Sequence, residues 1–237
     1  MAGAPWRLIF ETDRPAEQQM LVDERLAQEG RPVLRLFTWR PWAMSLGWKQ
    51  PRPEWLARCA TRTSNIVVVE RPTGGGIACH GTDVSWSVVM PRTEAPSVHH
   101  LASSVSWTVA NLCESFGAPA RALVDVRGSR RITVCLCEPS NYAVMTGMRK
   151  LAGLAIRRYH DSWLVQGSLL VRPLPSRVLE VLPSRVRHDW RACTVSLSEA
   201  AGRDITEEMA VQRWMTQGPA GLLNQAAAAE VVHADAL

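Results

Sequence analysis

A stretch of glycines stands between two apolar runs of this sequence. Ile66–Val69 is β-branched, Arg71 and Gly74–Gly76 follow it, and the alternating run Val84–Met90 comes next. The pattern predicts a strand, a glycine loop and a second strand. Three consecutive glycines let backbone N–H groups approach a ligand closely, because no Cβ intervenes and positive φ costs little. Arg71 would supply a planar cation for a carboxylate or phosphate.

The glycine loop by itself leaves two interpretations open. It can bind a ligand, with His80 and Asp83 following within a few residues, or it can be a plain hairpin connection. It is not a Walker loop, because no Gly-Lys-Ser or Gly-Lys-Thr follows. It is not a dinucleotide-binding fingerprint either, since a strand and not a helix comes next.

The wider motif is similar to that of a known family. Residues Arg71–Ser87 read Arg-Pro-Thr-Gly-Gly-Gly-x-x-x-His-x-x-Asp-x-x-x-Ser, which resembles the signature loop of the lipoate–protein ligase and octanoyltransferase family. Trp39–Gly47 matches a second segment of that family, although as a pure pattern it predicts only a β-hairpin with the preceding strand. The resemblance implies a substrate-binding role for Arg71, Thr73, Gly74, Gly75, Gly76, His80, Asp83 and Ser87.

A second cluster resembles the octanoyltransferase branch of the family. That branch carries Cys-x-x-x-Pro-Ser-x-Tyr, as Cys135–Tyr142 does, and the interval from this tyrosine to an essential lysine is the same here. Taken alone, Cys135 would be read as a core residue and Lys150 as surface. At this spacing the resemblance implies that Cys135 is the nucleophile and Lys150 its catalytic partner. It also places substrate-binding residues at Gly153, Ala155 and Gly167.

A cysteine and a lysine at these positions suit acyl transfer. A thiolate can attack a carrier thioester, hold the acyl group and release it to an acceptor amine. A fixed ammonium at Lys150 would favour the thiolate and, like the amides of Gly74–Gly76, could stabilise an oxyanion. Apolar strands with tryptophans would wall a tunnel for an octanoyl or lipoyl chain.

Several residues depart from the family pattern. Glu70 stands where the family has a first arginine, and Gly76 resembles the ligases more than the cysteine-type transferases. Met148 replaces a turn glycine, Leu154 replaces a serine and Gln166 replaces a histidine. The glycine loop therefore favours a ligase, whereas the cysteine favours a transferase.

Three functions follow from these residues, and a transferase is preferred. It would move an octanoyl (or lipoyl) group from a carrier thioester through Cys135 to the lysine of a lipoyl domain, with no cofactor. The alternative is the catalytic subunit of an ATP-dependent lipoate–protein ligase, which would use ATP and Mg²⁺ and form lipoyl-AMP. Family ligases need a C-terminal accessory domain, fused or separate, and no such domain fits after the closing helix here. A non-catalytic binder of lipoyl domains is the third reading.

The resemblance also implies partners. The donor would be acyl-carrier protein or another acyl donor, and the acceptor a lipoyl domain of the glycine cleavage H protein or of 2-oxoacid dehydrogenase E2. A ligase would add an accessory subunit. A net charge of +5 suits acidic partners, while scattered arginines argue against nucleic acid.

Composition limits the location and the metal chemistry. The sequence has no apolar run of about 18 residues and no signal-peptide pattern, so we expect a cytoplasmic protein without a membrane partner. Its six cysteines show no Cys-x-x-Cys pair, and we expect no metal site.

Periodicity predicts the elements that must position these residues. The resemblance implies an α+β fold, a biotin/lipoate protein ligase-like domain with a mixed β-sheet packed with helices. We expect one catalytic domain over 1–218 and an alanine-rich tail, 219–237, that frays. Strands are expected at 6–11, 33–39, 43–46, 66–69, 84–90, 132–137, 142–146, 151–157 and 163–171, and helices from 12–15 to about 28, and at 54–61, 97–117 and 178–191.

Overall fold

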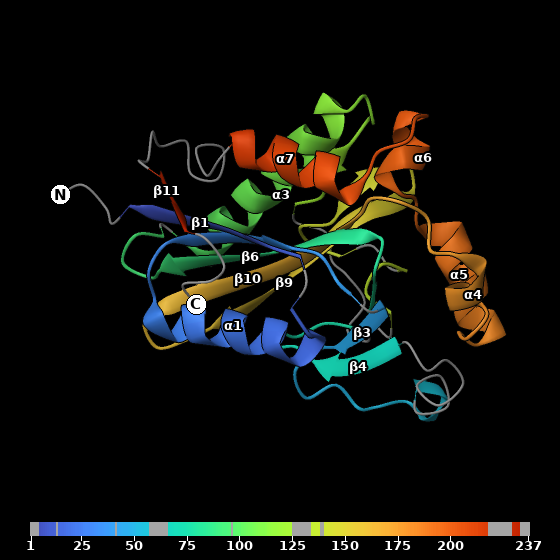
Figure 1. The fold of residues 1–237 in the computed structure, drawn as a ribbon, viewed down its shortest axis with the longest axis horizontal. Coiled ribbons are helices and arrows are strands. Elements are labelled where there is room, and N and C mark those ends of the chain that lie inside the picture. Colours follow the sequence, from blue (N-terminus) through green and yellow to red (C-terminus); the bar gives the residue numbers. More distant parts are fainter. Residues whose placement is uncertain are drawn as a thin grey trace.

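A large mixed sheet with helices on both faces forms the centre of the fold, and a small sheet lies beside it (Figure 1). This computed structural model describes residues 5–12, 14–40, 42–56, 66–95, 97–124, 134–137, 140–217 and 229–232. The expected α+β architecture with a mixed sheet is confirmed.

The large sheet has eight strands in the order β11-β1-β2-β6-β10-β9-β8-β7. Strands β11, β1 and β2 are parallel to one another, and from β2 onward every neighbouring pair is antiparallel. The strands are β1 (Trp6–Glu11), β2 (Val33–Phe37), β6 (Asp83–Pro91), β7 (Arg121–Ala122), β8 (Val144–Thr146), β9 (Arg149–Arg158), β10 (Ser162–Leu170) and β11 (Ala229–Val232).

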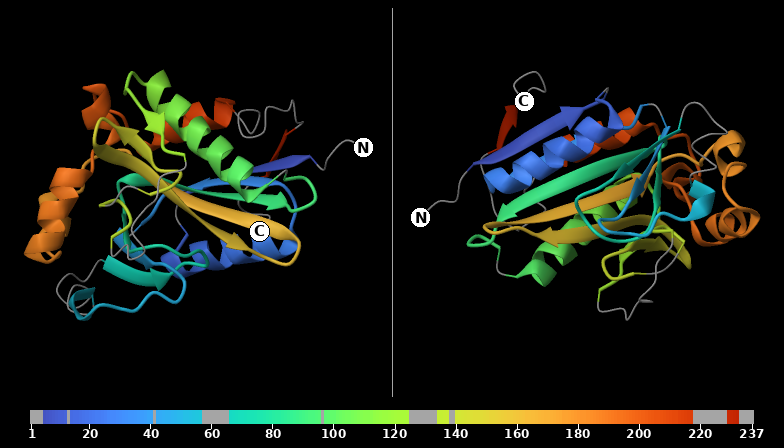
Figure 2. Two further views of the ribbon diagram at one scale, coloured as in Figure 1. Left: turned by 180° about the vertical axis from the view of Figure 1, so that it is seen from behind. Right: turned by 90° about the horizontal axis from the view of Figure 1, so that it is seen from below.

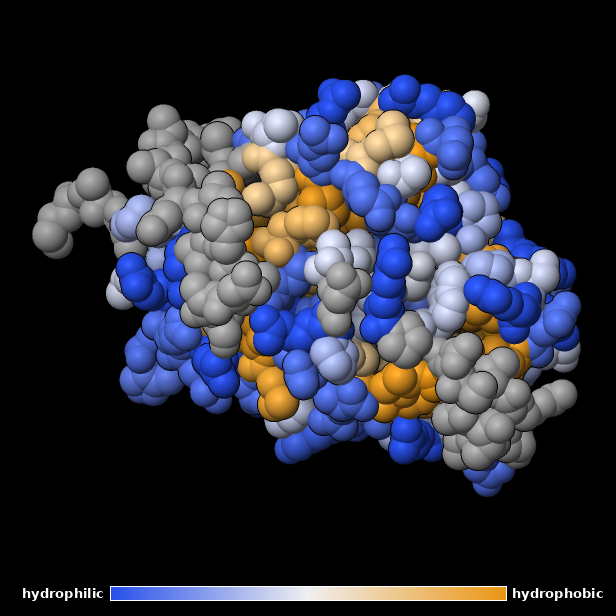
Figure 3. Space-filling model, viewed as in Figure 1, coloured by the Kyte–Doolittle hydropathy of each residue, from blue (hydrophilic) through white to orange (hydrophobic). Residues whose placement is uncertain are grey.

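Helices cover both faces of this sheet. Helices α3 and α7 pack on one face over the main apolar core, and α1 runs along the opposite face (Figures 1 and 2). Over α1, the surface in Figure 3 is mostly hydrophilic. No helix in the described ranges is long and apolar enough to cross a membrane. The helices are α1 (Ala16–Glu29), α3 (Val98–Ser115), α4 (Ser176–Leu179), α5 (Ser184–Cys193), α6 (Leu197–Ala201) and α7 (Glu207–Gln217).

Local signals begin and end several of these helices. Helix α1 ends at Gly30, which adopts a left-handed conformation with φ 67°. The Ser97 side chain caps α3 by accepting the N–H of His100. Ser196 and Glu199 form a capping box at the start of α6. These ends lie close to where the sequence places them. Of the helix expected at 54–61, only 54–56 lie in the described residues, and they are helical.

The small sheet corrects two expectations about connections. Its strands β3 (Trp42–Leu46), β4 (Ile66–Glu70) and β5 (Ala78–His80) lie in the order β4-β3-β5. Strand β3 therefore pairs within the small sheet and forms no hairpin with β2, which belongs to the large sheet. The glycine loop is no hairpin turn either, because it carries the chain from one side of β3 to the other.

Two further expectations about strands were wrong. Residues 132 and 133 lie outside the described residues, and Val134 makes only an isolated bridge to Ile77. The chain then turns, with the N–H of Cys137 donating to the carbonyl of Val134 at 3.1 Å, so Cys135 and Cys137 do not alternate along a strand. In the tail, Ala229–Val232 pair in parallel with β1 as β11, where fraying was expected. In the tail, pairing with β1 overrides the local pattern.

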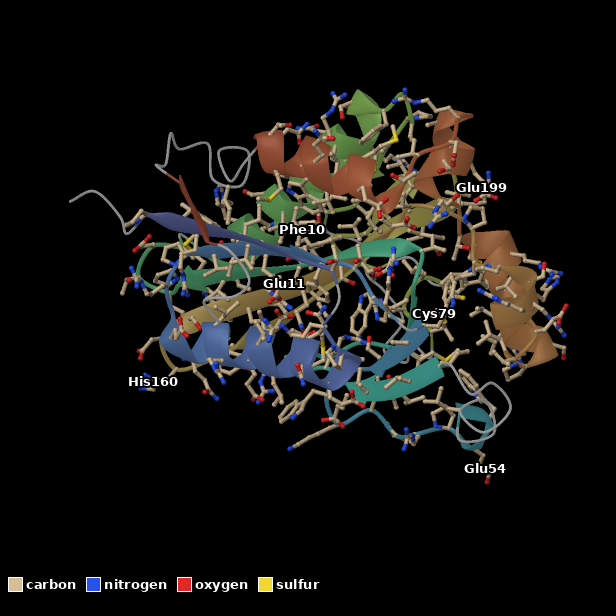
Figure 4. All side chains as sticks on the ribbon, viewed as in Figure 1. Phe10, Glu11, Glu54, Cys79, His160 and Glu199 are labelled. Carbon is tan, nitrogen blue, oxygen red and sulfur yellow. The ribbon has the colours of Figure 1, made fainter. Side chains whose placement is uncertain are left out.

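A buried ion cluster joins α1 to the large sheet. Arg35 of β2 is fully buried, and its guanidinium donates to Glu11 at 2.6 Å and to Asp23 of α1 at 2.5 Å. Figure 4 shows Glu11 on the side of β1 toward α1, whereas Phe10 lies on the side toward α7. Strand alternation thus sends one residue into the apolar core and the next into the ion cluster.

We expect Arg35→Met to lower the free energy of unfolding by about 3–5 kcal/mol, because it removes the cation that Asp23 and Glu11 share and leaves Glu11 with Arg14 alone. Urea unfolding measures this change. The control is Arg7→Met, whose pair with Glu29 lies at the surface at 2.8 Å. That variant should lose less than about 1 kcal/mol. Equal losses in both variants would contradict the role given to burial.

Candidate active site

The glycine loop crosses the end of β3 in direct contact with its backbone. The N–H of Trp48 donates to the carbonyl of Thr73 at 2.8 Å, and the N–H of Arg71 donates to the carbonyl of Leu46 at 2.9 Å. A Cβ on Gly47 would lie 2.1 Å from the carbonyl oxygen of Gly75, closer than atoms can approach. Gly47 is therefore required by the crossing, and Gly75 takes a φ of 94° that favours glycine.

The Arg71 side chain hydrogen-bonds to the backbone of the glycine loop. Its Nη1 donates to the carbonyl of Ser45 at 3.0 Å, and its Nη2 donates to the carbonyls of Gly74 at 2.6 Å and Gly76 at 2.8 Å. Burial lowers the pKa of Arg71, and the charge on Cys135 opposes this shift. The sequence analysis expected a cation for a substrate carboxylate or phosphate. In the structure the guanidinium donates to these backbone oxygens and to the Ser45 hydroxyl at 3.2 Å, and Arg71 also lines the cavity described below, so its role toward a substrate stays a prediction.

Thr73 connects the loop to α1 through Gln166. The side-chain oxygen of Gln166 accepts from the Thr73 hydroxyl at 2.7 Å, and its nitrogen donates to Asp23 at 2.6 Å. Ser87 donates to the same carboxylate at 2.7 Å. A carboxamide can donate on one side and accept on the other, and both are used here. Gln166, a departure from the family pattern, thus has a defined role in holding the loop.

His80 and Asp83 form a buried polar cluster next to β3. His80 Nδ1 lies 2.8 Å from Asp83 Oδ2, and its Nε2 lies 2.8 Å from the Ser45 hydroxyl. Ser85 and Ser168 also donate to Asp83, at 2.9 and 2.6 Å. Burial raises the pKa of Asp83, but the charge and hydrogen bond of His80 and the other donors outweigh it, so the pKa is lowered overall.

Cys135 and Lys150 meet beside the glycine loop. The N–H of Cys135 donates to the carbonyl of Ile77, the residue after the loop, at 2.8 Å. Lys150, at the start of β9, is buried, and its Nζ donates to the Cys135 carbonyl at 2.7 Å and the Ser140 hydroxyl at 2.9 Å. A Cβ on Gly153 would lie 2.9 Å from Lys150 Cε and 3.9 Å from Cys135 Sγ. Gly153 therefore leaves the space that brings the two residues together.

The turn that carries Cys135 is tied to the rest of the sheet at its far end. Tyr142 has a φ of 66°, which is uncommon for a side chain other than glycine. Its N–H donates to the carbonyl of Leu123 at 2.7 Å, and its carbonyl accepts from Ser106 of α3 at 2.7 Å. These bonds offset the strain and fix the end of the turn.

One cavity brings six of the thirteen expected site residues together. Six of the expected site residues line it: Arg71, His80, Cys135, Gly153, Ala155 and Gly167. Thr73, Asp83, Ser87 and Lys150 do not line it, but they hydrogen-bond within the networks behind its wall. The apolar part of the wall includes Met20, Phe37, Trp39, Ala78, Leu136 and Leu154.

Sequence reasoning missed several residues at this cavity. Ser45, Ser85 and Ser168 line it, and Ser140 contacts Lys150. Ser45 and Ser140 lie inside the matched segments, so their position was a usable signal. Ser168 also lies in a matched segment, Gln166–Leu170, but its contact with Asp83 joins residues 85 positions apart and has no local signal.

Comparison with known proteins identifies the family. Residues 14–217 match the lipoyl protein ligase A/B catalytic domain. This chain belongs to that family. A protein of Symbiobacterium thermophilum named octanoyltransferase LipM is 31% identical over 220 residues, which are 85% of this chain and 80% of that protein. The protein of that name from Geobacillus kaustophilus is 28% identical over 234 residues, covering 89% and 84% of the two chains.

Solved structures of the family share the fold. A bi-partite lipoate protein ligase of Thermoplasma acidophilum, studied with its E2 lipoyl domain, gives a TM-score of 0.73 at 16% identity and covers 98% of this chain and 88% of that one. Lipoate-protein ligase A bound with ATP gives 0.71 at 18% identity and covers 98% and 90%. The expected biotin/lipoate ligase-like fold is confirmed.

Asp83→Asn should destabilise the protein at neutral pH by about 3 kcal/mol, because it removes the charge that His80 and the surrounding donors stabilise. Since the folded pKa of Asp83 lies below the ordinary 3.8, this stability is present above that pH and is lost as the pH falls through the folded value. Urea unfolding at pH 7 and at low pH should show the difference from the native chain shrinking in acid.

Asp161→Asn supplies the matched control for Asp83→Asn. Asp161 also pairs with a histidine, His160, at 2.7 Å, but both side chains are exposed to solvent. This variant should unfold like the native chain at both pH values. A pH-independent loss in Asp83→Asn would show that the carboxylate charge does not carry the effect.

Proposed function

We propose that this chain is an octanoyltransferase that moves an octanoyl group from a carrier thioester, through Cys135, to the lysine of a lipoyl domain. The observation that supports it most is the position of Cys135 on the cavity wall, with the buried Lys150 beside it and Gly153 between them. The two relatives named octanoyltransferase LipM cover most of this chain and favour the same activity.

In this proposal the reaction has two transfers. The Cys135 thiolate attacks the carbonyl carbon of the donor thioester, and the carrier leaves as its thiolate, which takes up the proton that the acceptor amine later releases. The amine of the acceptor lysine then attacks the cysteine thioester and the Cys135 thiolate leaves. Lys150 holds the carbonyl of Cys135, so it fixes the sulfur relative to the cavity while charge develops on the oxygen of each tetrahedral intermediate.

The acyl chain would occupy the cavity beyond the sulfur. Met20, Phe37 and Leu154 offer apolar surface there, which suits an octanoyl chain. The donor is proposed to be acyl-carrier protein, and the acceptor a lipoyl domain of the glycine cleavage H protein or of 2-oxoacid dehydrogenase E2. The recognised chemistry is the same in both acceptors, a lysine amine on a small acidic domain.

Exposed arginines near the site support acidic partners. Arg177, Arg185 and Arg191 on α4 and α5 are exposed, and none of the ion pairs within the described part of the chain involves them. Helix α5 leads into Thr194, which makes a bridge to Lys150. A partner that binds Arg191, three residues before Thr194, would therefore contact the end of α5 that is nearest to Lys150.

We expect the native chain to gain one octanoyl group when incubated with octanoyl-acyl-carrier protein in the absence of ATP, and Cys135→Ala to gain none. Intact-mass spectrometry measures the adduct. The matched control is Cys137→Ala, which lies two residues away in the same turn and outside the cavity. It should acylate like the native chain. Cys113 should stay unmodified, because burial raises its pKa to about 12.

Two results would overturn this proposal in favour of the alternatives. Lipoylation of an added lipoyl domain that requires ATP, with a partner subunit if one is needed, would identify a ligase. Binding of the lipoyl domain with neither an adduct nor an ATP-dependent reaction would identify a non-catalytic binder.

Gly153→Ala should slow acyl-enzyme formation by about 10²-fold, because the added methyl group displaces the Lys150 side chain from its place beside Cys135. The methyl carbon would lie 2.9 Å from Lys150 Cε and 3.1 Å from Nζ. The rate of octanoyl adduct formation measures the loss, and circular dichroism checks that the fold is retained. If the variant is folded and forms the adduct at the native rate, the proposed role of Lys150 in acyl transfer is wrong.

A further inference from the structure

Ser45, His80 and Asp83 form a continuous row of hydrogen bonds at the cavity. The Ser45 hydroxyl lies 2.8 Å from His80 Nε2, and His80 Nδ1 lies 2.8 Å from Asp83 Oδ2. The three residues come from β3, β5 and β6, and all of them are buried. The proposed acyl transfer through Cys135 assigns no chemical step to any of these three residues.

The protons in this row can be assigned from its neighbours. The Asp83 carboxylate accepts the hydroxyls of Ser85 and Ser168 and the N–H of Gly81 at 2.9 Å. Its pKa is lowered, since His80 and these donors outweigh burial, so it is ionised and can only accept from the imidazole. His80 therefore carries a proton on Nδ1.

Arg71 and His80 both lie within hydrogen-bonding distance of the Ser45 hydroxyl. Arg71 Nη1 donates to the Ser45 oxygen at 3.2 Å, so that side of the hydroxyl acts as an acceptor. With the His80 proton on Nδ1 only, Nε2 would accept the hydroxyl proton, which is one of the two donor–acceptor arrangements that the 2.8 Å contact allows and the one that this proposal uses. The order hydroxyl, Nε2, Nδ1–H and carboxylate is that of a serine nucleophile with its base and the carboxylate that orients the base.

The surroundings favour reaction at Ser45. Arg71 places a cation against the oxygen, which stabilises negative charge that develops there. The ring of Trp39 stacks on His80 with 4.1 Å between centroids, which holds the imidazole plane. Ser45, His80 and Cys135 all line the same cavity, so an acyl group that enters it can reach a hydroxyl as well as a thiol.

We propose that Ser45 is a second nucleophile, which hydrolyses medium-chain acyl esters and thioesters independently of Cys135. Only the length of the acyl chain rests on the proposed octanoyltransferase function. The activity would discharge an acyl group from the cavity as the free carboxylic acid when no acceptor amine is present.

The reaction balances with water as the co-reactant. The Ser45 oxygen bonds to the acyl carbon while its proton passes to His80 Nε2, and the alcohol or thiol leaves with that proton. Water then adds to the Ser45 ester and gives a proton to His80. The ester bond breaks, the carboxylic acid leaves, and the proton returns to the Ser45 oxygen.

The test uses the full chain with Cys135→Ala, so that it does not depend on the proposed relay. We expect this variant to release p-nitrophenol repeatedly from p-nitrophenyl octanoate. Adding Ser45→Ala should lower that rate at least tenfold. Adding Ser103→Ala instead should leave it unchanged, since Ser103 is an equally buried serine on α3, away from the cavity. Thermal melting verifies that each variant is folded.

A second measurement needs no change at Ser45. An octyl fluorophosphonate added to Cys135→Ala should label Ser45, as mapped by peptide mass spectrometry. Three results would overturn the proposal: release that stops at one equivalent, equal release with and without Ser45→Ala, or no label on Ser45. If the native chain does not transfer octanoyl groups, only the proposed octanoyltransferase function is contradicted. Both measurements described here are made on Cys135→Ala and do not depend on that cysteine.

Discussion

Contact between two backbones at the end of β3 sets the position of the cavity. The glycine loop passes over Gly47 so closely that a single Cβ would lie 2.1 Å from the carbonyl oxygen of Gly75. The buried Arg71 side chain holds the loop in place. Removing its charged guanidinium from water costs free energy. Backbone carbonyls offset that cost, and Ile77 at the end of the loop then accepts the N–H of Cys135. The residue that follows the loop thus fixes the backbone of Cys135.

Buried charge connects this wall to the rest of the fold. From Thr73 the hydrogen bonds run through Gln166 to Asp23 and on to Arg35, so α1, two strands and the loop share one network. A carboxylate in place of Gln166 would face Asp23 with like charge and could not donate to it. Such a network fixes one arrangement of the elements, since each partner that moves leaves a buried polar group unsatisfied.

The two nucleophiles that we propose at this cavity have different surroundings. Cys135 sits on a turn that is anchored at both ends, and a lysine holds its carbonyl. Ser45 sits on a strand, with a histidine and an arginine against its oxygen. A thioester on sulfur stays reactive toward an incoming amine, so the cysteine suits transfer. An ester on oxygen is less reactive to amines, and the histidine next to it suits hydrolysis by water.

The sequence by itself determined the secondary structure of most segments and the family, because periodicity, caps and motif spacing are local. It also placed Cys135 and Lys150 at the site, on the spacing of the second cluster. Only the tertiary structure decided that the glycine loop crosses β3, that Cys135 lies on a turn and that residues of the tail join β1. Strand order is set by burial and by hydrogen bonds between distant segments, as in the bond of Gln166 to Asp23 across 143 positions. No local pattern records which partner a buried polar side chain will find, and the chemistry at Ser45 depends on such partners.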